Sequence, residues 1–229
     1  MGFILRALKA DLHVHTTYSD GLDPVEVVLE AALEKGLDVI AITDHNTFKG
    51  SLAASKVIKE KGLDLVLVYG NEVRASYLGK LMDVLVLCPE YPGEGWPRDA
   101  LTLYDWAEKR GCLYVPAHPF DSRRYGCGEL LYDLEVHAIE VWNARAPRSL
   151  NEEALRAAEL LGKPGIANSD AHEAEQVALA HSVLEAEPTP EGVLEAILKG
   201  RVRVVKGSVS TMGYLKYVKR KLLNKRRRY

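Results

Sequence analysis

The sequence predicts an α/β fold in which parallel strands are joined by helical crossovers. Short apolar segments alternate with segments of helical periodicity, and the breaks between them are brief. This alternation is typical of sheets whose consecutive strands are connected through a helix. The chain has 229 residues and no internal repeat or Pro/Gly/Ser-rich linker before about residue 208, so one large domain is expected.

The predicted strands are a first segment beginning at about Lys9, followed by residues 37–43, 63–70, 80–87, 113–117, 138–142, 165–169, 181–186 and 201–206. The predicted helices are residues 24–35, 49–61, 99–110, 150–161 and 190–199. Asp23, Ser149 and Thr189 are the expected N-caps, since short polar side chains satisfy the free N–H groups of a first helical turn. Gly36, Gly111, Gly162 and Gly200 mark where four of these helices end.

The distribution of charge divides the chain into an acidic body and a basic C-terminal segment. Residues 196–229 hold twelve Lys or Arg and no acidic residue, which leaves 18 basic against 32 acidic residues in the first 195. We expect one large domain over residues 1–207 and a basic C-terminal tail over residues 208–229. The tail is interpreted either as a solubilising, frayed terminus or as a phosphate-binding segment with two basic clusters, Lys219-Arg220-Lys221 and residues 225–228.

Composition limits the classes of protein to which this chain can belong. The three cysteines, Cys88, Cys112 and Cys127, are odd in number and lack Cys-x-x-Cys spacing, so we expect them to be reduced and mostly buried. No apolar run approaches the roughly 20 residues of a membrane span, and the apolar N-terminus is too short for a signal peptide. A cytoplasmic protein without a membrane partner is expected, and the oligomeric state stays open.

Histidines and carboxylates gather where predicted strands end. His13 and His15 are two residues apart, so they share one face of the first strand. The candidates at or just after strand ends are His13, His15, His45, Glu72, His118, Asp170 and His172, with Asp20 in the loop after the first strand. Barrels of alternating strands and helices build their active sites at these ends. The pattern predicts a shared metal site, whereas His137 and His181 lack this setting and are expected to be structural.

These blocks resemble those of the PHP family, the polymerase and histidinol phosphatase superfamily. The blocks, in order, are His13-x-His15 with Ser19-Asp20-Gly21, Thr43-Asp44-His45, Gly70-x-Glu72, His118-Pro119 and Ser169-Asp170-Ala171-His172. The resemblance covers about residues 9–206. It implies a distorted (β/α)7-type barrel that encloses two or three divalent ions, zinc, manganese or iron, and hydrolyses phosphoesters.

The resemblance also implies a division of the ligands. His13, His15, Glu72 and Asp170 would hold one metal, Glu72 would bridge to a second held also by His118, and Asp20, His45 and His172 would hold the third. Members with a complete cluster usually supply a further His or Cys after the sixth strand. Here residues 142–148 contain neither, and Asn143 offers only an amide oxygen.

The expected reaction is hydrolysis of a phosphomonoester or nucleotide. Metals roughly 3.5–4 Å apart can share a hydroxide and neutralise charge on the attacking and leaving oxygens. Asp44, Asp170 and His172 are the candidate catalytic residues, and Asp44 is either an orienting group or a proton donor. Cationic side chains suited to the phosphate are Arg74, Arg123, Arg124, Arg145 and Arg148.

Other functions fit the same residues. The cluster could act on RNA or DNA ends while the basic tail binds the nucleic-acid backbone. The chain could instead be a non-catalytic, metal-stabilised nucleic-acid-binding module, although it keeps eight matching ligand positions. Hydrolysis of a C–N bond or a lactone is chemically open too, because a metal hydroxide also attacks carbonyl carbon.

Overall fold

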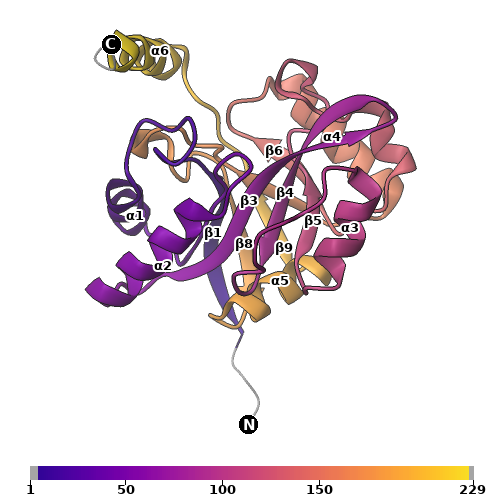
Figure 1. Cartoon of the computed structure of the whole chain (residues 1–229), viewed down its shortest axis with the longest axis horizontal. Helices are drawn as coiled ribbons and strands as arrows, with labels where there is room; N and C mark the ends of the chain where they lie inside the picture. The colour runs from indigo at the N-terminus through magenta and orange to yellow at the C-terminus, as the bar shows by residue number, and fades with distance from the viewer. Residues whose placement is uncertain (1–4, 227–229) are drawn as a thin grey trace.

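A seven-stranded mixed sheet forms the centre of the computed structural model, which describes residues 5–226 and the side chains as far as Leu223 (Figure 1). The strand order is β5-β4-β3-β2-β1-β8-β9. These strands are β1 (Arg6–Val14), β2 (Val39–Ile42), β3 (Val66–Tyr77), β4 (Lys80–Cys88), β5 (Leu113–Pro116), β8 (His181–Ala186) and β9 (Val202–Val205). A second sheet pairs β6 (Ile139–Asn143) with β7 (Gly165–Asn168).

The second sheet lies beside the end of β1, so the two sheets curl around a common interior. The Leu12 N–H donates to Asn168 Oδ1 at 2.9 Å, and the His15 N–H donates to the Ala171 carbonyl at 2.8 Å. The result is a curled half-barrel of mixed α/β type.

The expectation of parallel strands throughout is wrong. β1–β2, β2–β3 and β6–β7 are parallel, whereas β3–β4, β4–β5, β1–β8 and β8–β9 are antiparallel. β3 and β4 are joined by a tight hairpin in which Leu78 and Gly79 both have positive φ, 49° and 77°. A hairpin of this length enforces antiparallel pairing, because a parallel connection needs a longer crossover.

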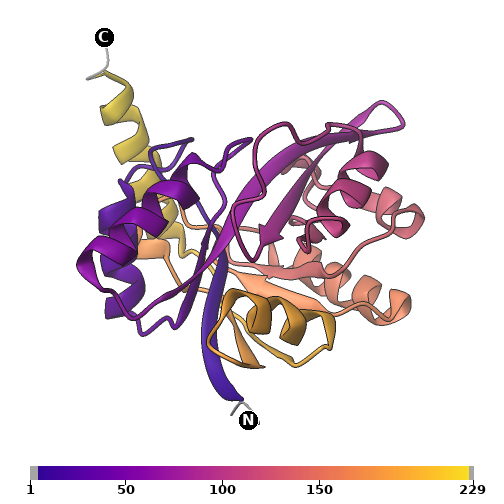
Figure 2. The same cartoon turned by 60° about the horizontal axis from the view of Figure 1, so that its bottom comes forward.

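Helices cover the curled sheet on its outer sides. They are α1 (Val25–Glu34), α2 (Lys49–Lys61), α3 (Ala100–Glu108), α4 (Arg148–Leu161) and α5 (Pro190–Leu198), whereas α6 (Thr211–Arg226) projects from one side of the molecule. Figure 1 shows α1 and α2 on one side of the sheet and α3 on the other, and Figure 2 shows α5 below it. β2 is fully buried because it lies between apolar groups on both faces, as its continuous run Val39–Ile42 predicts.

Two of the three expected N-caps are wrong. Thr189 accepts a hydrogen bond from the Gly192 N–H, as expected. α1 and α4 instead begin after Pro24 and Pro147, and neither helix has a side-chain cap. Asp23 accepts the Ala174 N–H and pairs with Arg220 of α6, because a contact distant in sequence competes with the local cap.

The cysteine prediction is confirmed for burial, since all three side chains are buried, but it is wrong for the oxidation state of two of them. Cys88 and Cys112 form a disulfide, and Cys127 is free and buried. Cys88 ends β4 and Cys112 precedes β5, and the pairing of Leu87 with Leu113 places the two cysteines side by side. Sequence spacing could not show this proximity because it arises from antiparallel strand pairing.

The basic tail contains a helix, α6, that projects from the body (Figure 1) and contacts it through side chains that include Tyr217, Arg220 and Lys221. The segment before it is fixed, since Trp142 Nε1 donates to the Gly207 carbonyl and the Val209 N–H donates to the Ala144 carbonyl, each at 2.8 Å. Residues 227–228 of the predicted basic cluster lie outside the described residues, and the domain boundary at 208 stays a prediction. Within the described residues, no helix is long and apolar enough to cross a membrane.

Candidate metal centre

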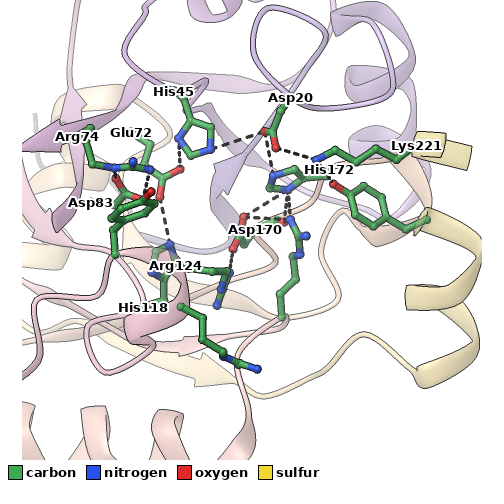
Figure 3. Close-up of a pocket in the computed structure, with 14 residues that line it drawn as sticks. Asp20, His45, Glu72, Arg74, Asp83, His118, Arg124, Asp170, His172 and Lys221 are labelled. Carbon is green, nitrogen blue, oxygen red and sulfur yellow. Dashed lines mark hydrogen bonds and ion pairs between the residues drawn. The ribbon is translucent and has the colours of Figure 1, made fainter. Parts of the chain in front are cut away.

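Six of the eight predicted ligands line one pocket inside the curled sheet (Figure 3), and the other two, His13 and His15, lie directly behind it in donor groups with Glu72 and Asp170. The elements that carry them are β1, β3 and the segments that follow β1, β2, β5 and β7. β3 continues to Tyr77, so Glu72 lies within this strand and does not follow it as predicted. The pocket has a volume of about 200 Å³.

The first group of donors combines two imidazoles and two carboxylates. His13 Nε2 and His15 Nε2 are 3.1 Å apart. Glu72 Oε2 lies 3.3 Å from His13 Nε2 and 3.2 Å from His15 Nε2. Asp170 Oδ1 lies 3.6 and 3.4 Å from the same two nitrogens. The donor atoms of these four side chains therefore face one position beside the pocket.

Glu72 connects this group to His118 and His45. Glu72 Oε1 is 3.1 Å from His118 Nε2, and Glu72 Oε2 is 3.0 Å from His45 Nδ1. Because its two oxygens face different imidazoles, Glu72 has the geometry of a bridging carboxylate.

A third group lies at the outer side of the pocket. Asp20 Oδ1 is 3.0 Å from His172 Nε2 and 3.6 Å from His45 Nε2. The second nitrogen of His172, Nδ1, lies 3.0 Å from the Asp170 carbonyl, which orients the ring so that Nε2 faces Asp20.

The donor atoms fit divalent metal ions. Glu72 Oε2, Asp20 Oδ1 and His118 Nδ1 are buried and have no hydrogen-bond partner among the described residues. A buried carboxylate oxygen left unpaired is costly, and a metal ion satisfies it. Imidazole and carboxylate donors without thiolate suit zinc, manganese or iron.

The electrostatics of the pocket favour a cation. Burial opposes ionisation, yet the imidazoles of His13 and His118 hold the pKa of Glu72 well below its usual range. Burial likewise opposes charge on His15, but Asp170 and Glu72 raise its pKa to about 9. Burial, His15 and Arg145 lower the pKa of His172 to about 4, so this ring is neutral near pH 7. Glu72 is therefore ionised, and the neutral ring of His172 keeps a nitrogen lone pair that can bind a metal ion.

Two candidate ligands have unusual backbone conformations. His118 and Asp170 have φ of 31° and 53°, in the left-handed region that L-residues rarely occupy. Strained backbone of this kind persists where the surroundings fix it, and it is concentrated at functional sites. The His118 N–H donates to Glu140 Oε2 at 2.7 Å, which holds this conformation.

Glu140 is a functional residue that the sequence interpretation missed. Its Oε1 accepts from His13 Nδ1 at 2.9 Å and from Asn168 Nδ2 at 2.8 Å. Because an ionised carboxylate only accepts, His13 carries its proton on Nδ1 and presents Nε2 to the pocket. A single carboxylate inside the apolar strand Ile139–Asn143 is the signal that could have identified it.

Asp44 does not line the pocket, and its contacts are those of an orienting group, one of the two roles expected for it. It is fully buried and accepts hydrogen bonds from the Thr16 N–H, from Thr16 Oγ1 and from Ser19 Oγ. Gly50 makes room for this carboxylate, since a Cβ there would lie 2.0 Å from Asp44 Oδ2. Asp44 therefore fixes the loop that carries Asp20.

Asn143 is occupied by other partners. Its Nδ2 donates to Glu140 Oε2 at 3.0 Å and to Asp170 Oδ2 at 3.1 Å, and its Oδ1 accepts the Arg145 N–H at 2.9 Å. The amide therefore orients a candidate ligand, and its oxygen is not free to replace the missing His or Cys.

The five predicted phosphate-binding arginines have different settings. Arg74, Arg123, Arg124 and Arg145 line the metal pocket, and Arg148 does not. Arg124 donates to Asp170 Oδ2, and Arg145 Nη1 contacts His172 Nδ1. Arg148 pairs with Glu152 and lines an adjoining groove together with Arg123 and Arg145.

Four further pocket residues were not predicted: Asp83, Tyr125, Tyr217 and Lys221. Asp83 pairs with Arg74, whose guanidinium lies 3.5 Å from the centre of the Tyr125 ring. Tyr217 and Lys221 belong to α6. Outside the pocket, His137 and His181 make ordinary structural contacts, to the Tyr114 N–H and to the Ala178 carbonyl.

Comparisons with known proteins identify the family. A model of the PHP domain matches residues 11–109, and a model of the PHP-associated region matches residues 148–202. An uncharacterised protein of Methanocaldococcus jannaschii is 31% identical over 148 residues, which cover 60% of this chain and 82% of that protein. The chain belongs to the PHP family. This is a family of metal-dependent phosphoesterases, the class that the resemblance implied.

Relatives with named activities match over shorter lengths. A phosphoribosyl 1,2-cyclic phosphate 1,2-diphosphodiesterase of Eggerthella lenta is 45% identical over 102 residues, 44% of this chain and 37% of that enzyme. The 5'-3' exoribonuclease Rnm of Salmonella typhimurium is 44% identical over 67 residues, 29% of this chain and 23% of that enzyme. The chain thus spans less than half of either enzyme.

Solved structures show the same PHP fold. A two-domain protein of Bacteroides vulgatus that contains a predicted PHP-like metal-dependent phosphoesterase superposes with a TM-score of 0.72. The match has 21% identity and covers 89% of this chain and 66% of that protein. The fold is a mixed α/β fold with a curled half-barrel sheet, and the expected distorted (β/α)7-type barrel is not confirmed.

Proposed function

We propose that this PHP protein hydrolyses a phosphomonoester or a nucleotide with two or three divalent ions bound in its pocket. The observation that carries the proposal is the convergence of eight donor side chains in and directly behind one pocket, which is bordered by four arginines. Carboxylates and imidazoles suit the ions, and guanidinium groups suit a phosphate.

The ligands divide as the distances suggest. His13, His15, Glu72 and Asp170 would hold one ion, and Glu72 and His118 would hold a second. Asp20, His45 and His172 would hold a third. When bound, such ions supply an acidified water and neutralise charge on phosphoryl oxygens.

The protein itself binds and orients the phosphate. Arg145 is fixed against His172 and the Asp170 carbonyl, so its remaining N–H groups are available at the pocket. Arg123 is 70% exposed at the entrance, while its pairing with Asp121 restricts its motion. These two arginines can bind different oxygens of one phosphate. Arg124 is committed to Asp170 and supports that ligand.

The two serines of the motifs are not suited to be nucleophiles. Ser19 Oγ donates to Asp44, and Ser169 Oγ donates to Asp11. Both hydroxyls are used to hold loops, so the proposal needs no covalent intermediate.

A second candidate is action on the ends of RNA or DNA. A groove of about 650 Å³ adjoins the pocket and is lined by Arg123, Arg145, Arg148 and Tyr214. Cations beside an aromatic ring suit a nucleotide strand, since phosphates pair with the cations and a base stacks on the ring. The partial similarity to an exoribonuclease supports the same candidate.

A hydrolysis panel separates the two candidates. Purified protein loaded with Zn²⁺, Mn²⁺ or Fe²⁺ is tested on sugar phosphates, mononucleotides and short oligonucleotides, with a chelator-treated sample as control. Metal-dependent release of phosphate from small substrates is expected. Absence of hydrolysis with every metal and substrate class would contradict the proposed function.

The salt dependence of oligonucleotide binding tests the nucleic-acid candidate separately. A polynucleotide held by several cations loses affinity steeply as salt rises. If the tail binds it, deletion of residues 214–229 reduces this slope. An unchanged affinity and slope after deletion would remove the tail from that candidate.

A further inference from the structure

One residue of α6, Tyr217, is buried against the metal pocket. Tyr217 is only 3% exposed, although Tyr214 and Leu215 of the same helix are more than half exposed. The Tyr217 ring meets His172 edge to face, with ring centres 5.9 Å apart, and the guanidinium of Arg145 lies 5.0 Å from its centre. The pocket is therefore closed on this side by a residue of the basic tail.

The helix is anchored next to this tyrosine. Arg220 donates to both oxygens of Asp23, and a second carboxylate, Glu173, lies 3.7 Å away. Asp23 is itself held by the Ala174 N–H at 2.9 Å. These contacts, together with the buried Tyr217, dock the helix without any contribution from Lys221.

Lys221 places an ammonium group at the edge of the predicted third metal site. Its Nζ is 3.1 Å from Asp20 Oδ2 and donates to Tyr217 Oη at 2.8 Å (Figure 3). The other oxygen of Asp20 faces His172 and His45. A single carboxylate thus separates the ammonium from the imidazoles of that site.

The position of Lys221 suits a phosphate better than it suits a simple anchor. Its side chain is 44% exposed, and it lines the same pocket of about 200 Å³ as Arg145 and the candidate ligands. An exposed ion pair with Asp20 contributes little to stability. A phosphoryl group that reaches ions held by Asp20 and His172 comes within reach of the ammonium, which binds phosphate as a point charge.

We propose that α6 forms a wall of the substrate site, in which Lys221 binds a phosphoryl oxygen of the substrate and Tyr217 positions its ammonium group. The inference rests on the proposed function and deepens it. It assigns a substrate-binding role to the tail at the pocket itself. Because the buried Tyr217 side chain closes this side of the pocket, we expect substrates that carry a terminal phosphate.

The test compares Lys221→Gln and Lys221→Arg with Lys219→Gln, a matched loss of charge at an exposed lysine of the same helix. Calorimetry measures the binding of inorganic phosphate to the metal-loaded protein, and elemental analysis measures its metal content. We expect Lys221→Gln to weaken phosphate binding about tenfold, Lys221→Arg to stay within a few-fold of wild type, and Lys219→Gln to match wild type. Metal content should not fall in any of them.

Two results would overturn the inference. One is phosphate binding by Lys221→Gln that equals wild type. The other is an equal loss in Lys219→Gln, which would indicate a general effect of tail charge. Limited proteolysis reports whether α6 stays docked. If Lys221→Gln releases the helix, the Lys221→Arg variant tests the inference instead, because it keeps the positive charge and the docked helix. Weak phosphate binding by Lys221→Arg would then contradict the inference.

Kinetics separate this inference from the proposed function. If wild type hydrolyses a phosphoester, Lys221→Gln should raise KM with little change in kcat. An unchanged KM would contradict this inference and leave the proposed function intact. If no substrate is hydrolysed while phosphate binding still depends on Lys221, the proposed function fails and the phosphate site remains.

Discussion

The pocket has two walls that are held in different ways. The strand wall carries His13, His15, Glu72 and Asp170, which are almost fully buried and joined by short contacts. The helix wall is α6, whose Arg220 and Lys221 side chains are each 44% exposed and pair with Asp23 and Asp20. The strand wall is fixed by the sheet, whereas the helix wall depends on a few side chains. We therefore expect changes to the first to affect metal binding and changes to the second to affect substrate binding.

The largest expected effect follows Asp170→Asn, in the strand wall. Asp170 faces both His13 and His15, and loss of its charge removes a ligand shared by the first group. Hydrolysis should fall at least about a thousandfold together with metal content, while circular dichroism stays that of wild type. Asp133→Asn, at an exposed position, is the control. Full activity with normal metal content in Asp170→Asn would remove this residue from the ligands.

The next effect concerns the disulfide, which joins two strands of the sheet and does not contact α6. Cys88 and Cys112 close a loop with a sequence separation of 24. Replacing both by Ala should lower the free energy of unfolding by about 3 kcal/mol, since the unfolded chain gains freedom. Denaturant titration measures the change in the free energy of unfolding. The affinity for phosphate at the helix wall should stay that of wild type. A free energy of unfolding equal to that of wild type would show that the disulfide does not stabilise the fold.

The free thiol gives an internal check on that experiment. Burial raises the pKa of Cys127 to about 12, so this thiol stays protonated and unreactive at pH 8 in the folded protein. A thiol reagent should detect one group after unfolding without reductant and three after reduction. Three groups without reductant would contradict the disulfide.

Glu140→Gln tests how the strand wall is oriented. Glu140 accepts from His13 Nδ1 and the His118 N–H, so it fixes two candidate ligands without lining the pocket. Metal affinity should fall about 10- to 100-fold, as for other carboxylates that support ligating histidines. Competition with a fluorescent chelator measures the affinity. An affinity within twofold of wild type would make Glu140 a purely structural residue.

The smallest effect is expected at the anchor of the helix wall. Burial opposes ionisation of Asp23, but Arg220 and the Ala174 N–H hold its pKa below the usual range. The stabilisation is therefore present above the ordinary carboxyl pKa and is lost as pH falls through the depressed value. Protease cleavage within α6 should rise a few-fold between pH 6 and pH 3 in wild type and should be raised already at pH 6 in Arg220→Gln. Equal cleavage of both proteins at pH 6 would contradict this anchor.

The strand wall was largely predictable from sequence because each ligand lies close to an apolar strand, and strand ends meet at one edge. The pairing of strands was less predictable, since Leu78-Gly79 lacks the Asn-Gly or Asp-Gly signature of a hairpin, and the disulfide of Cys88 follows from that pairing. Glu140 was missed because only ligands at strand ends were considered. The docking of α6 was missed because Tyr217, Arg220 and Lys221 meet partners about 200 positions away or on separate loops, and no local pattern encodes such contacts.

The central claim is that the converging side chains hold metal ions. Anomalous diffraction from crystals of protein loaded with Mn²⁺ or Zn²⁺ tests it most directly. The account predicts peaks among the donor atoms of His13, His15, Glu72 and Asp170, and among those of Asp20, His45 and His172. Loaded crystals with no anomalous peak among these residues, or with peaks only elsewhere, would contradict it.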